Sequence, residues 1–380
     1  MTYAELGIEV DKLRLLRAQV AVITFFDADK ETFRTELIAI ADALIAVNFR
    51  VSFNPFLPDE YITSVVNIKC WLSELLDSNA YRLCPEMSYC IEKMIERWNK
   101  QGQPRNVVFT LGDFAIRKYK RDIVSKQIPF LYSLQLRTGI TLTKEPVFIF
   151  VPDQFKDDLL SCVLLFHEVG HFVVHDNFLI DMVYTDILPK IIASRTAKIR
   201  RDYFPWLLGK DLATVPDLEL KLRYHIDEYI SDVFGTQYAH EHIMCFLSHK
   251  RAKMPNDESL THPSYNCRKR IVDSFLDYCR TGRTRDSFID SMTTHLPDLS
   301  KKESTLTEAE LMDPNLRFAN EDQMFSAFAP SWRLVMREVA RNRIARANEA
   351  TYMQICALPI FQTLNNNLKS AISNNMRLHP

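Results

Sequence analysis

The sequence predicts a helix-rich α+β protein, and two observations support this prediction. The chain has 380 residues but only 8 glycines, and scarce glycine disfavours the many tight turns of an all-β protein. Apolar residues also recur at helical spacing over several long stretches, whereas only a few short runs have the composition of strands. The hydrophobic content of 47% supports a sizeable core, and the length allows two or three domains.

Residues 1–143 are expected to form an N-terminal α/β region of unknown role. A run of arginines and lysines in 114–125 predicts a helix with a solvated basic face. No motif with a known chemistry occurs in this region. The other elements expected here are helices over 1–18, 30–47, 58–77 and 85–100, and strands over 20–26, 51–55 and 107–111.

Residues 144–296 are expected to form the core of the protein, and 308–380 a C-terminal helical region of two or three amphipathic helices. The core opens with the most apolar strand of the chain, which Pro152 and Asp153 end. In chain order, the sequence predicts a strand over 146–151, an apolar helix from about 158, a long helix over 218–247, a polar loop over 250–260, a helix opening near 261 and a polar linker over 297–307.

The apolar helix contains the pattern H-E-x-x-H, formed by His167, Glu168 and His171. Positions i and i+4 lie on one face of a helix, so both imidazoles can point at one metal ion while Glu168 reaches a water on that metal. Burying two histidines and an acid costs several kcal/mol unless they are paired or bind a metal. The pattern therefore predicts a zinc hydrolase site with two histidine ligands and a general base.

A catalytic zinc site usually has three protein ligands and a water, and Glu228 is the best candidate for the third ligand. It is followed at i+4 by Asp232, which can accept a hydrogen bond from a liganding histidine and orient it. Asp227, which points about 100° away on the same helix, and His225 are the rivals. His175 is excluded, because along a straight helix it is roughly 12 Å from the first histidine.

These residues resemble the gluzincin clan of zinc metallopeptidases. The phrase Phe166-His-Glu-Val-Gly-His-Phe-Val-Val-His175 is similar to ImmA/IrrE-type peptidases. The later phrase Thr261-His-Pro-Ser264 is similar to the motif of CAAX prenyl proteases and their relatives. The resemblance covers about 145–275, and it implies a zincin-like core with an active-site helix and a small sheet.

The resemblance also implies a role for each residue of the site. It makes His167, His171 and Glu228 the ligands of a Zn²⁺ cofactor. Glu168 becomes the general base, and Asp232 becomes the partner of a liganding histidine.

The motif near residue 262 implies the groups that stabilise the oxyanion of the transition state. His262 is the expected donor, with Arg268 or Arg270 near it, and Tyr265 is a second candidate donor. The CAAX prenyl proteases place an Arg-Ile pair closer to His-Pro than Arg270-Ile271 stands here. The choice between the two arginines therefore stays open.

Composition limits the expected partners and location. The net charge of −1 gives no electrostatic footprint for nucleic acid. The 8 cysteines are scattered without a C-x-x-C pair, which favours reduced thiols in a cytoplasmic protein. The first residues lack the features of a signal peptide, and no run of 18 apolar residues occurs, so no membrane span is expected.

The expected function is a zinc metallopeptidase that hydrolyses peptide bonds in a protein or peptide substrate. The alternative is a non-catalytic zinc-binding regulatory or sensor protein on the same scaffold. In a third interpretation, 1–143 and 308–380 restrain the protease until a regulatory partner binds, although plain packing domains explain these flanks at least as well.

Overall fold

The computed structural model describes residues 3–25, 28–51, 59–80, 83–99, 102, 105–111, 115–117, 145–244, 258–283, 286–342, 344 and 349–378. The chain forms two compact units. The first comprises Met1–Leu83 and Gly102–Lys156, and the second comprises Cys84–Gln101 and Asp157–Pro380. The strand expected to open the core thus belongs to the first unit, and the expected helix near 85–100 belongs to the second.

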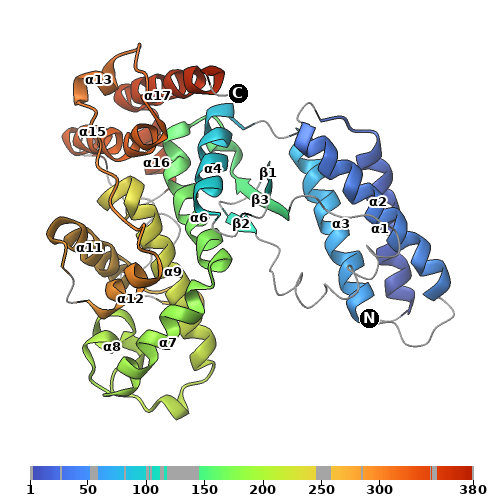
Figure 1. The fold of residues 1–380 in the computed structure, drawn as a ribbon, viewed down its shortest axis with the longest axis horizontal. Coiled ribbons are helices and arrows are strands. Elements are labelled where there is room, and N and C mark those ends of the chain that lie inside the picture. Colours follow the sequence, from blue (N-terminus) through green and yellow to red (C-terminus); the bar gives the residue numbers. More distant parts are fainter. Residues whose placement is uncertain are drawn as a thin grey trace. The chain divides into compact units, whose positions relative to one another are not determined.

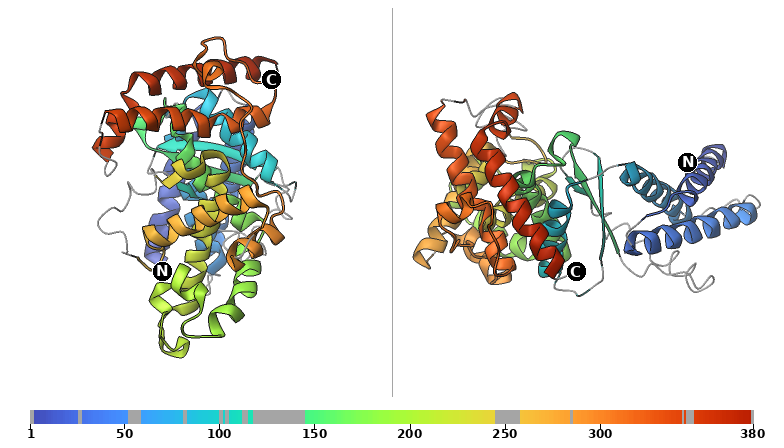
Figure 2. Two further views of the ribbon diagram at one scale, coloured as in Figure 1. Left: turned by 90° about the vertical axis from the view of Figure 1, so that its left-hand side faces the viewer. Right: turned by 90° about the horizontal axis from the view of Figure 1, so that it is seen from above.

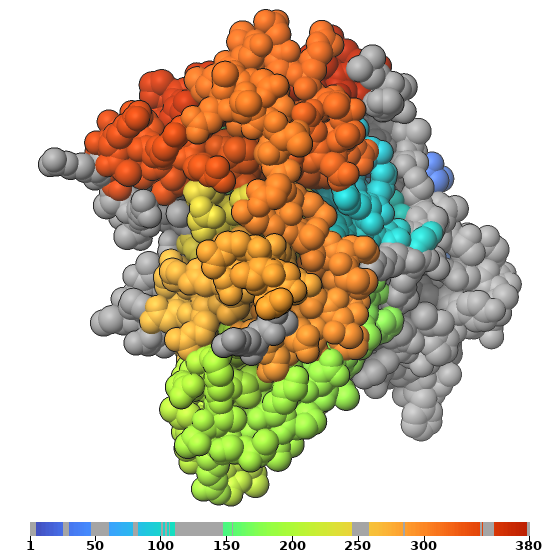
Figure 3. Space-filling model, turned by 60° about the vertical axis from the view of Figure 1, so that its left-hand side comes forward, coloured from blue at the N-terminus to red at the C-terminus, as the bar shows by residue number. Residues whose placement is uncertain are grey.

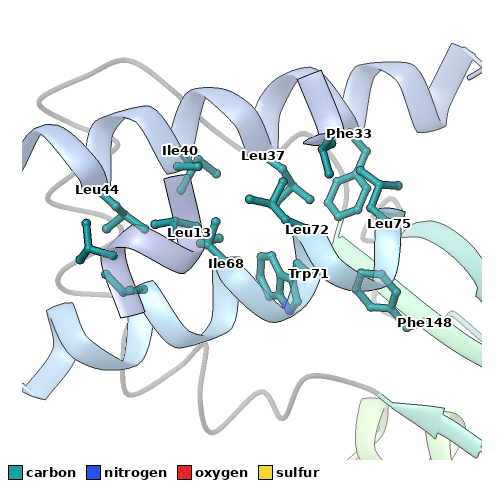
Figure 4. Close-up of a cluster of buried hydrophobic side chains, with 14 of the residues drawn as sticks. Leu13, Phe33, Leu37, Ile40, Leu44, Ile68, Trp71, Leu72, Leu75 and Phe148 are labelled. Atoms are coloured by element: carbon teal, nitrogen blue, oxygen red, sulfur yellow. The ribbon is translucent and has the colours of Figure 1, made fainter. Parts of the chain in front are cut away.

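The first unit contains three long helices, α1 (Tyr3–Ala21), α2 (Ala28–Val51) and α3 (Asp59–Ala80), which contact one another pairwise (Figure 1). Their apolar faces enclose the hydrophobic core drawn in Figure 4. On α2 the core residues follow one another at intervals of three or four, which is the period of one helical face. The labelled core residues are Leu13 of α1, Phe33, Leu37, Ile40 and Leu44 of α2, Ile68, Trp71, Leu72 and Leu75 of α3, and Phe148 of the sheet.

The first unit also contains a small mixed sheet of β1 (Arg105–Leu111), β2 (Ala115–Arg117) and β3 (Glu145–Val151). The strand order is β1-β3-β2, with β1 parallel and β2 antiparallel to β3. The central position of β3 explains its unbroken apolar run, since its residues are covered on both faces. Helix α3 packs on β1, and the ring of Phe148 lies 6.3 Å from that of Phe33, so sheet and helices share one core.

The second unit is helical, and its described residues contain no strand. Figures 1 and 2 show its helices gathered around α6 and α9. Its helices are α4 (Pro85–Trp98), α6 (Cys162–Asp176), α7 (Leu179–Ile192), α8 (Lys198–Tyr203), α9 (Leu218–Ala239), α11 (Tyr265–Thr281), α12 (Ser287–His295), α13 (Glu308–Met312), α14 (Glu321–Ser326), α15 (Phe328–Arg341), α16 (Glu349–Cys356) and α17 (Pro359–Leu378). Short 3₁₀ turns lie at Asp153–Phe155 in the first unit and at Leu159–Ser161, Pro205–Leu207, Leu212–Thr214 and His240–His242 in the second.

Helices α6 and α9 lie in close contact because α6 carries a glycine at the contact. A Cβ added to Gly170 of α6 would lie 2.7 Å from the Cα of Ser231 on α9. A Cβ added to Gly235 of α9 would lie 3.1 Å from the side chain of Ile243 and at an ordinary contact distance, 3.4 Å, from the backbone nitrogen of His167. Any larger residue at position 170 would therefore push apart the two helices that carry the expected metal ligands.

The C-terminal helices pack against the beginning of α6. The indole N–H of Trp332 on α15 donates to the carbonyl of Leu160 at 3.0 Å, and the N–H of Leu160 donates to Asn365 of α17 at 3.1 Å. The rings of Phe166 and Phe328 meet edge to face at 5.0 Å. Residues 308–380 thus belong to the hydrophobic core of the second unit.

The segment 297–307, expected as a polar linker, contains no helix or strand and runs over the surface of this unit (Figure 3). It is fixed to the end of α9. The N–H of Lys302 donates to the carbonyl of Gln237 at 2.8 Å, and the N–H of Ser300 donates to the side chain of Gln237 at 3.1 Å.

The structure confirms the helix-rich α+β class, the strands at 107–111 and 146–151, and the expected long helices. Three expectations were wrong. Residues 308–380, expected to form two or three helices, contain five in their described part, α13 to α17. Val20 and Ala21 end α1 instead of opening a strand, because Val20 is a fully buried residue of the core-facing side of that helix. Ala115–Arg117 forms β2 on the sheet edge instead of part of a basic helix. The strand expected at 51–55 begins at the last residue of α2 and otherwise lies outside the described residues.

One described stretch, Leu159–Asp176, is long and apolar enough to cross a membrane by length and composition, and 78% of it is buried inside the protein. It contains α6. Its apolar character has a structural explanation, since α6 is packed by α9 on one side and by α4 on another.

Candidate metal centre

The expected zinc ligands lie on the two helices that meet at Gly170. His167 and His171 come from α6 at i and i+4, and Glu228 comes from the facing side of α9. One ligand atom from each of the three residues can be chosen so that all lie within 4.8 Å of one another. The side chains of His167 and Glu228 are less than one tenth exposed, and that of His171 is 19% exposed. The group could hold a metal ion.

The distances within this group suit a tetrahedral ion. Nε2 of His167 lies 3.7 Å from Oε2 of Glu228, and Nε2 of His171 lies 3.7 Å from Oε1 of the same carboxylate. Ligand bonds of about 2.0–2.2 Å in a tetrahedral site separate neighbouring ligand atoms by about 3.3–3.6 Å. Both imidazoles therefore present Nε2 to the carboxylate of Glu228, each at a distance slightly longer than that between neighbouring ligands of a tetrahedral metal ion.

The other nitrogen of each imidazole faces an acid of α9. Nδ1 of His171 lies 2.8 Å from Oδ1 of Asp227 and 3.0 Å from the hydroxyl of Ser231. Nδ1 of His167 lies 3.1 Å from Oδ1 of Asp232, at an angle outside that of a regular hydrogen bond. An acid on Nδ1 keeps the proton there and leaves Nε2 free to bind a metal. Asp232 thus occupies the place expected of it.

Asp227 was considered from the sequence only as a rival ligand, and the structure places it behind His171 instead. Its position directly before Glu228 is the reason, because neighbouring residues on a helix point about 100° apart and so reach different sides of the same group. Ser231 follows Asp227 at i+4 and shares its histidine. Two parallel i, i+4 pairs on α9 therefore contact the two histidines, and the sequence predicted a role only for the pair Glu228 and Asp232.

Arg268 lies behind the carboxylates. Its guanidinium donates to both oxygens of Asp232, at 2.8 and 2.6 Å, and lies 3.1 Å from Oε2 of Glu228. The residue is 8% exposed. The sequence predicts Arg268 or Arg270 beside the oxyanion. The guanidinium of Arg268 instead contacts the carboxylates of Asp232 and Glu228, so this arginine orients the two acids.

Arg270 points to another side of α11. Its guanidinium donates to Asp202 at 2.8 Å, and its side chain is about half exposed. Residues two apart on a helix differ in direction by about 200°, so Arg268 and Arg270 cannot both face α9. Arg270 is therefore a surface ion-pair partner in this structure, which corrects its expected place in the site.

His262 stands at the edge of the metal group. Its Nε2 lies 3.2 Å from Oε1 of Glu228, its Nδ1 lies 2.6 Å from the hydroxyl of Thr261, and its side chain is 31% exposed. Tyr265 begins α11 three residues later and is half-buried. The geometry places His262 beside the carboxylate of Glu228, and a role for His262 or Tyr265 as a donor to the oxyanion stays a prediction.

Glu168 follows the first histidine and is half-buried on α6. It lies near enough to His171 to act on the pKa of that residue. His175, which the sequence excluded as a ligand, lies on the outer side of Asp227, with Nε2 3.3 Å from Oδ2. His175 therefore contacts Asp227 but does not lie at the position of a metal ligand.

Electrostatics keep the acids of the group ionised. Burial alone raises the pKa of Glu228, but Arg268 and both expected histidine ligands outweigh burial and lower it. The pKa of Asp232 is lowered against the same burial effect, chiefly by Arg268. Burial lowers the pKa of His171, but Asp227, Glu228 and Glu168 together raise it to about 10. In the absence of a metal, a proton on His171 compensates for the negative charge around it.

No protein-family model, curated protein or solved structure matches this chain.

Proposed function

We propose that this protein is a zinc metallopeptidase of the gluzincin type, with a zincin-like core formed around α6 and α9. The observation that carries the proposal is the convergence of two Nε2 atoms and one carboxylate on a single point, with an acid behind each imidazole. A structural metal would need only the ligands. Here a second carboxylate, Glu168, directly follows the first ligand, as a general base beside the metal requires.

Zinc is the ion that this donor set favours. Imidazole nitrogen with one carboxylate suits Zn²⁺, whereas Mg²⁺ and Ca²⁺ prefer oxygen alone. Three protein ligands leave one position for water or substrate, which distinguishes a catalytic site from a closed structural one. When bound here, zinc would lower the pKa of water toward about 7 and polarise a peptide carbonyl.

The other steps of hydrolysis would be carried out by side chains of the protein. Glu168 accepts the proton of the attacking water and delivers it to the amine that leaves, which is general base and general acid catalysis by one carboxylate. His262 donates from Nε2 to the oxyanion that develops on the carbonyl oxygen. Asp227 and Asp232 hold the two imidazoles so that Nε2 faces the site, and Arg268 holds the carboxylates.

The proposal is tested with the Glu168→Gln variant, with Glu219→Gln as a matched control on an exposed face of α9. Hydrolysis is measured with a library of quenched fluorescent peptides and with an unfolded protein, and zinc is measured by mass spectrometry. We expect about one zinc per chain in all three proteins and a fall in kcat of at least about 10²-fold in Glu168→Gln only.

Two results would contradict the proposal. One is a Glu168→Gln variant as fast as the control. The other is a wild-type protein that carries zinc but cleaves no member of the library, which would favour a regulatory zinc-binding role.

A further inference from the structure

One face of α9 holds the turn that carries His262. Lys221, His225 and Glu228 follow one another at i, i+4 and i+7, so they form a row along the helix. Each of the three contacts a residue of 258–262. Nζ of Lys221 lies 2.9 Å from Oε1 of Glu258. Nε2 of His225 lies 3.0 Å from the carbonyl oxygen of Ser259. Oε1 of Glu228 lies 3.2 Å from Nε2 of His262.

The middle contact is made by a fully buried side chain. His225 has no exposed surface, and its ring is packed edge to face against Trp206 and Tyr229. Burial lowers the pKa of His225 to about 4, so the imidazole is neutral at physiological pH. A carbonyl oxygen only accepts hydrogen bonds, so the single proton of this ring is on Nε2 and is donated to Ser259. Nδ1 has no hydrogen-bond partner among the described residues, so this donation is the polar contact that the ring makes here.

Hydrogen bonds within the turn connect Ser259 to His262. The N–H of Ser259 donates to the carbonyl of His262 at 2.9 Å, and the N–H of His262 donates to the hydroxyl of Ser259 at 3.0 Å. The hydroxyl of Thr261 contacts Nδ1 of His262 at 2.6 Å and so orients the ring. Fixing the carbonyl of Ser259 therefore fixes both the backbone of His262 and the direction of its Nε2.

We propose that His225 is a positioning residue for His262: by donating to the carbonyl of Ser259 it holds the turn 259–262 on α9 and keeps Nε2 of His262 at the metal centre. The catalytic consequence rests on the proposed function, whereas the placement of the turn does not. The ion pair of Lys221 with Glu258 is part-buried, as this hydrogen bond is, and it attaches the same turn to α9 one helical turn earlier.

Three variants of His225 distinguish the effect of losing the hydrogen bond from the effect of changing the side-chain volume. His225→Phe keeps an aromatic ring but has no donor. His225→Gln places an amide N–H near the position of Nε2 and keeps the donation. His225→Asn has a donor too, but its shorter side chain places the amide near the position of Nδ1, where it does not reach Ser259. If the phenylalanine variant does not fold, the comparison of glutamine with asparagine tests the same contact.

The first measurement is hydrogen–deuterium exchange of the full-length protein, followed on peptides that cover 258–264. We expect the amides of Ser259 and His262 to exchange at least about tenfold faster in His225→Phe and His225→Asn than in wild type, because their hydrogen bonds close the released turn. His225→Gln should be close to wild type, and peptides from α12 should not change. Unchanged exchange in the turn, or an equal increase throughout α9 and α11, would overturn the proposal.

The second measurement is a double-mutant cycle on peptidase activity. His225→Phe should lower kcat roughly 10- to 100-fold through misplacement of the donor, with zinc content unchanged. In the background of His262→Ala it should have no further effect, because the residue acts through His262. Independent, multiplicative losses would overturn the proposal. A wild type without peptidase activity would contradict the proposed function alone, and the exchange measurement would still decide the placement of the turn.

Discussion

At the scale of single residues, the metal centre is defined by what lies behind its ligands. His171 is held by Asp227 and Ser231, and His167 faces Asp232, which is in turn held by Arg268. Each imidazole would otherwise be free to rotate or to carry its proton on the other nitrogen. The acids therefore determine which nitrogen of each imidazole faces Glu228, and their charge would balance that of a bound cation.

The first residue-scale prediction concerns Asp232. Asp232→Asn removes the charge beside His167 and leaves the buried guanidinium of Arg268 with one acid fewer. We expect zinc affinity to fall about 10- to 100-fold, as measured by competition with a chromogenic chelator. Asp273→Asn, on an exposed ion pair of α11, is the control and should bind zinc as wild type does. Equal affinities in the two variants would show that Asp232 does not orient a ligand.

The second residue-scale prediction concerns pH and His240. This residue is 2% exposed, its Nε2–H donates to the carbonyl of Lys302, and burial lowers its pKa to about 4. In the unfolded chain the pKa of histidine is about 6.5, so between pH 6.5 and 4 the unfolded state binds a proton that the folded state does not. The free energy of unfolding should therefore fall as pH falls, by about 3 kcal/mol across this window.

The measurement is urea unfolding of wild type and His240→Gln between pH 4 and 7. Glutamine can donate to the same carbonyl but does not titrate. The stability difference between the two proteins should change with pH in the direction just given, and a difference that is constant over this range would contradict the assignment.

At the scale of elements, the site depends on how closely α6 approaches α9. Gly170 lies between the two histidine ligands and against the backbone of Ser231, which itself touches His171. The glycine inside H-E-x-x-H is therefore explained by packing, because a side chain there would separate the histidines from Glu228.

The element-scale prediction is that Gly170→Ala lowers the free energy of unfolding by about 1–3 kcal/mol and weakens zinc binding, because the new methyl group meets backbone atoms. Gly7→Ala is the control. It lies inside α1, where a Cβ has nothing within 4 Å, so alanine should stabilise the helix by about 0.5–1 kcal/mol. Thermal unfolding and chelator competition give both quantities. A Gly170→Ala protein as stable as wild type would contradict the close-packing explanation.

At the scale of the whole molecule, the second unit is assembled from distant parts of the sequence. α4 comes from before the sheet of the first unit and packs against α6. α15 and α17 come from the end of the chain, and they pack against α9 and against α4, respectively. Trp98 of α4 donates to the hydroxyl of Tyr238 on α9 at 2.9 Å. These contacts favour the interpretation of residues 308–380 as part of the core over a detachable regulatory region.

The whole-molecule prediction tests this with Trp332→Phe. The change keeps most of the ring volume but removes the N–H that satisfies the buried carbonyl of Leu160, next to the start of α6. We expect a loss of about 1–3 kcal/mol in the free energy of unfolding and no increase in peptidase activity. Arg337→Ala, on an exposed ion pair of the same helix, should change stability by less than about 0.5 kcal/mol. Higher activity in Trp332→Phe would instead support restraint by the C-terminal region.

The sequence by itself determined the helix-rich class, the apolar strands and the candidate ligands. It did so because these features are local: apolar period, scarcity of glycine and the i, i+4 spacing of His167 and His171 depend only on neighbours in the chain. The pair Glu228 and Asp232 was recognisable for the same reason. Where local patterns were ambiguous the predictions were wrong, as with the β-rich run at 20–26, whose first residue, Val20, is buried on a helix.

Only the tertiary structure decided which residues meet across elements. Asp227 lies behind His171, Arg268 turns to the acids while Arg270 turns away, and His225 reaches Ser259. None of these follows from spacing, because each depends on the approach and rotation of one helix against another or against a turn. The sequence thus contains the ligands in recognisable form, whereas their orientation is a property of how α6, α9 and α11 pack.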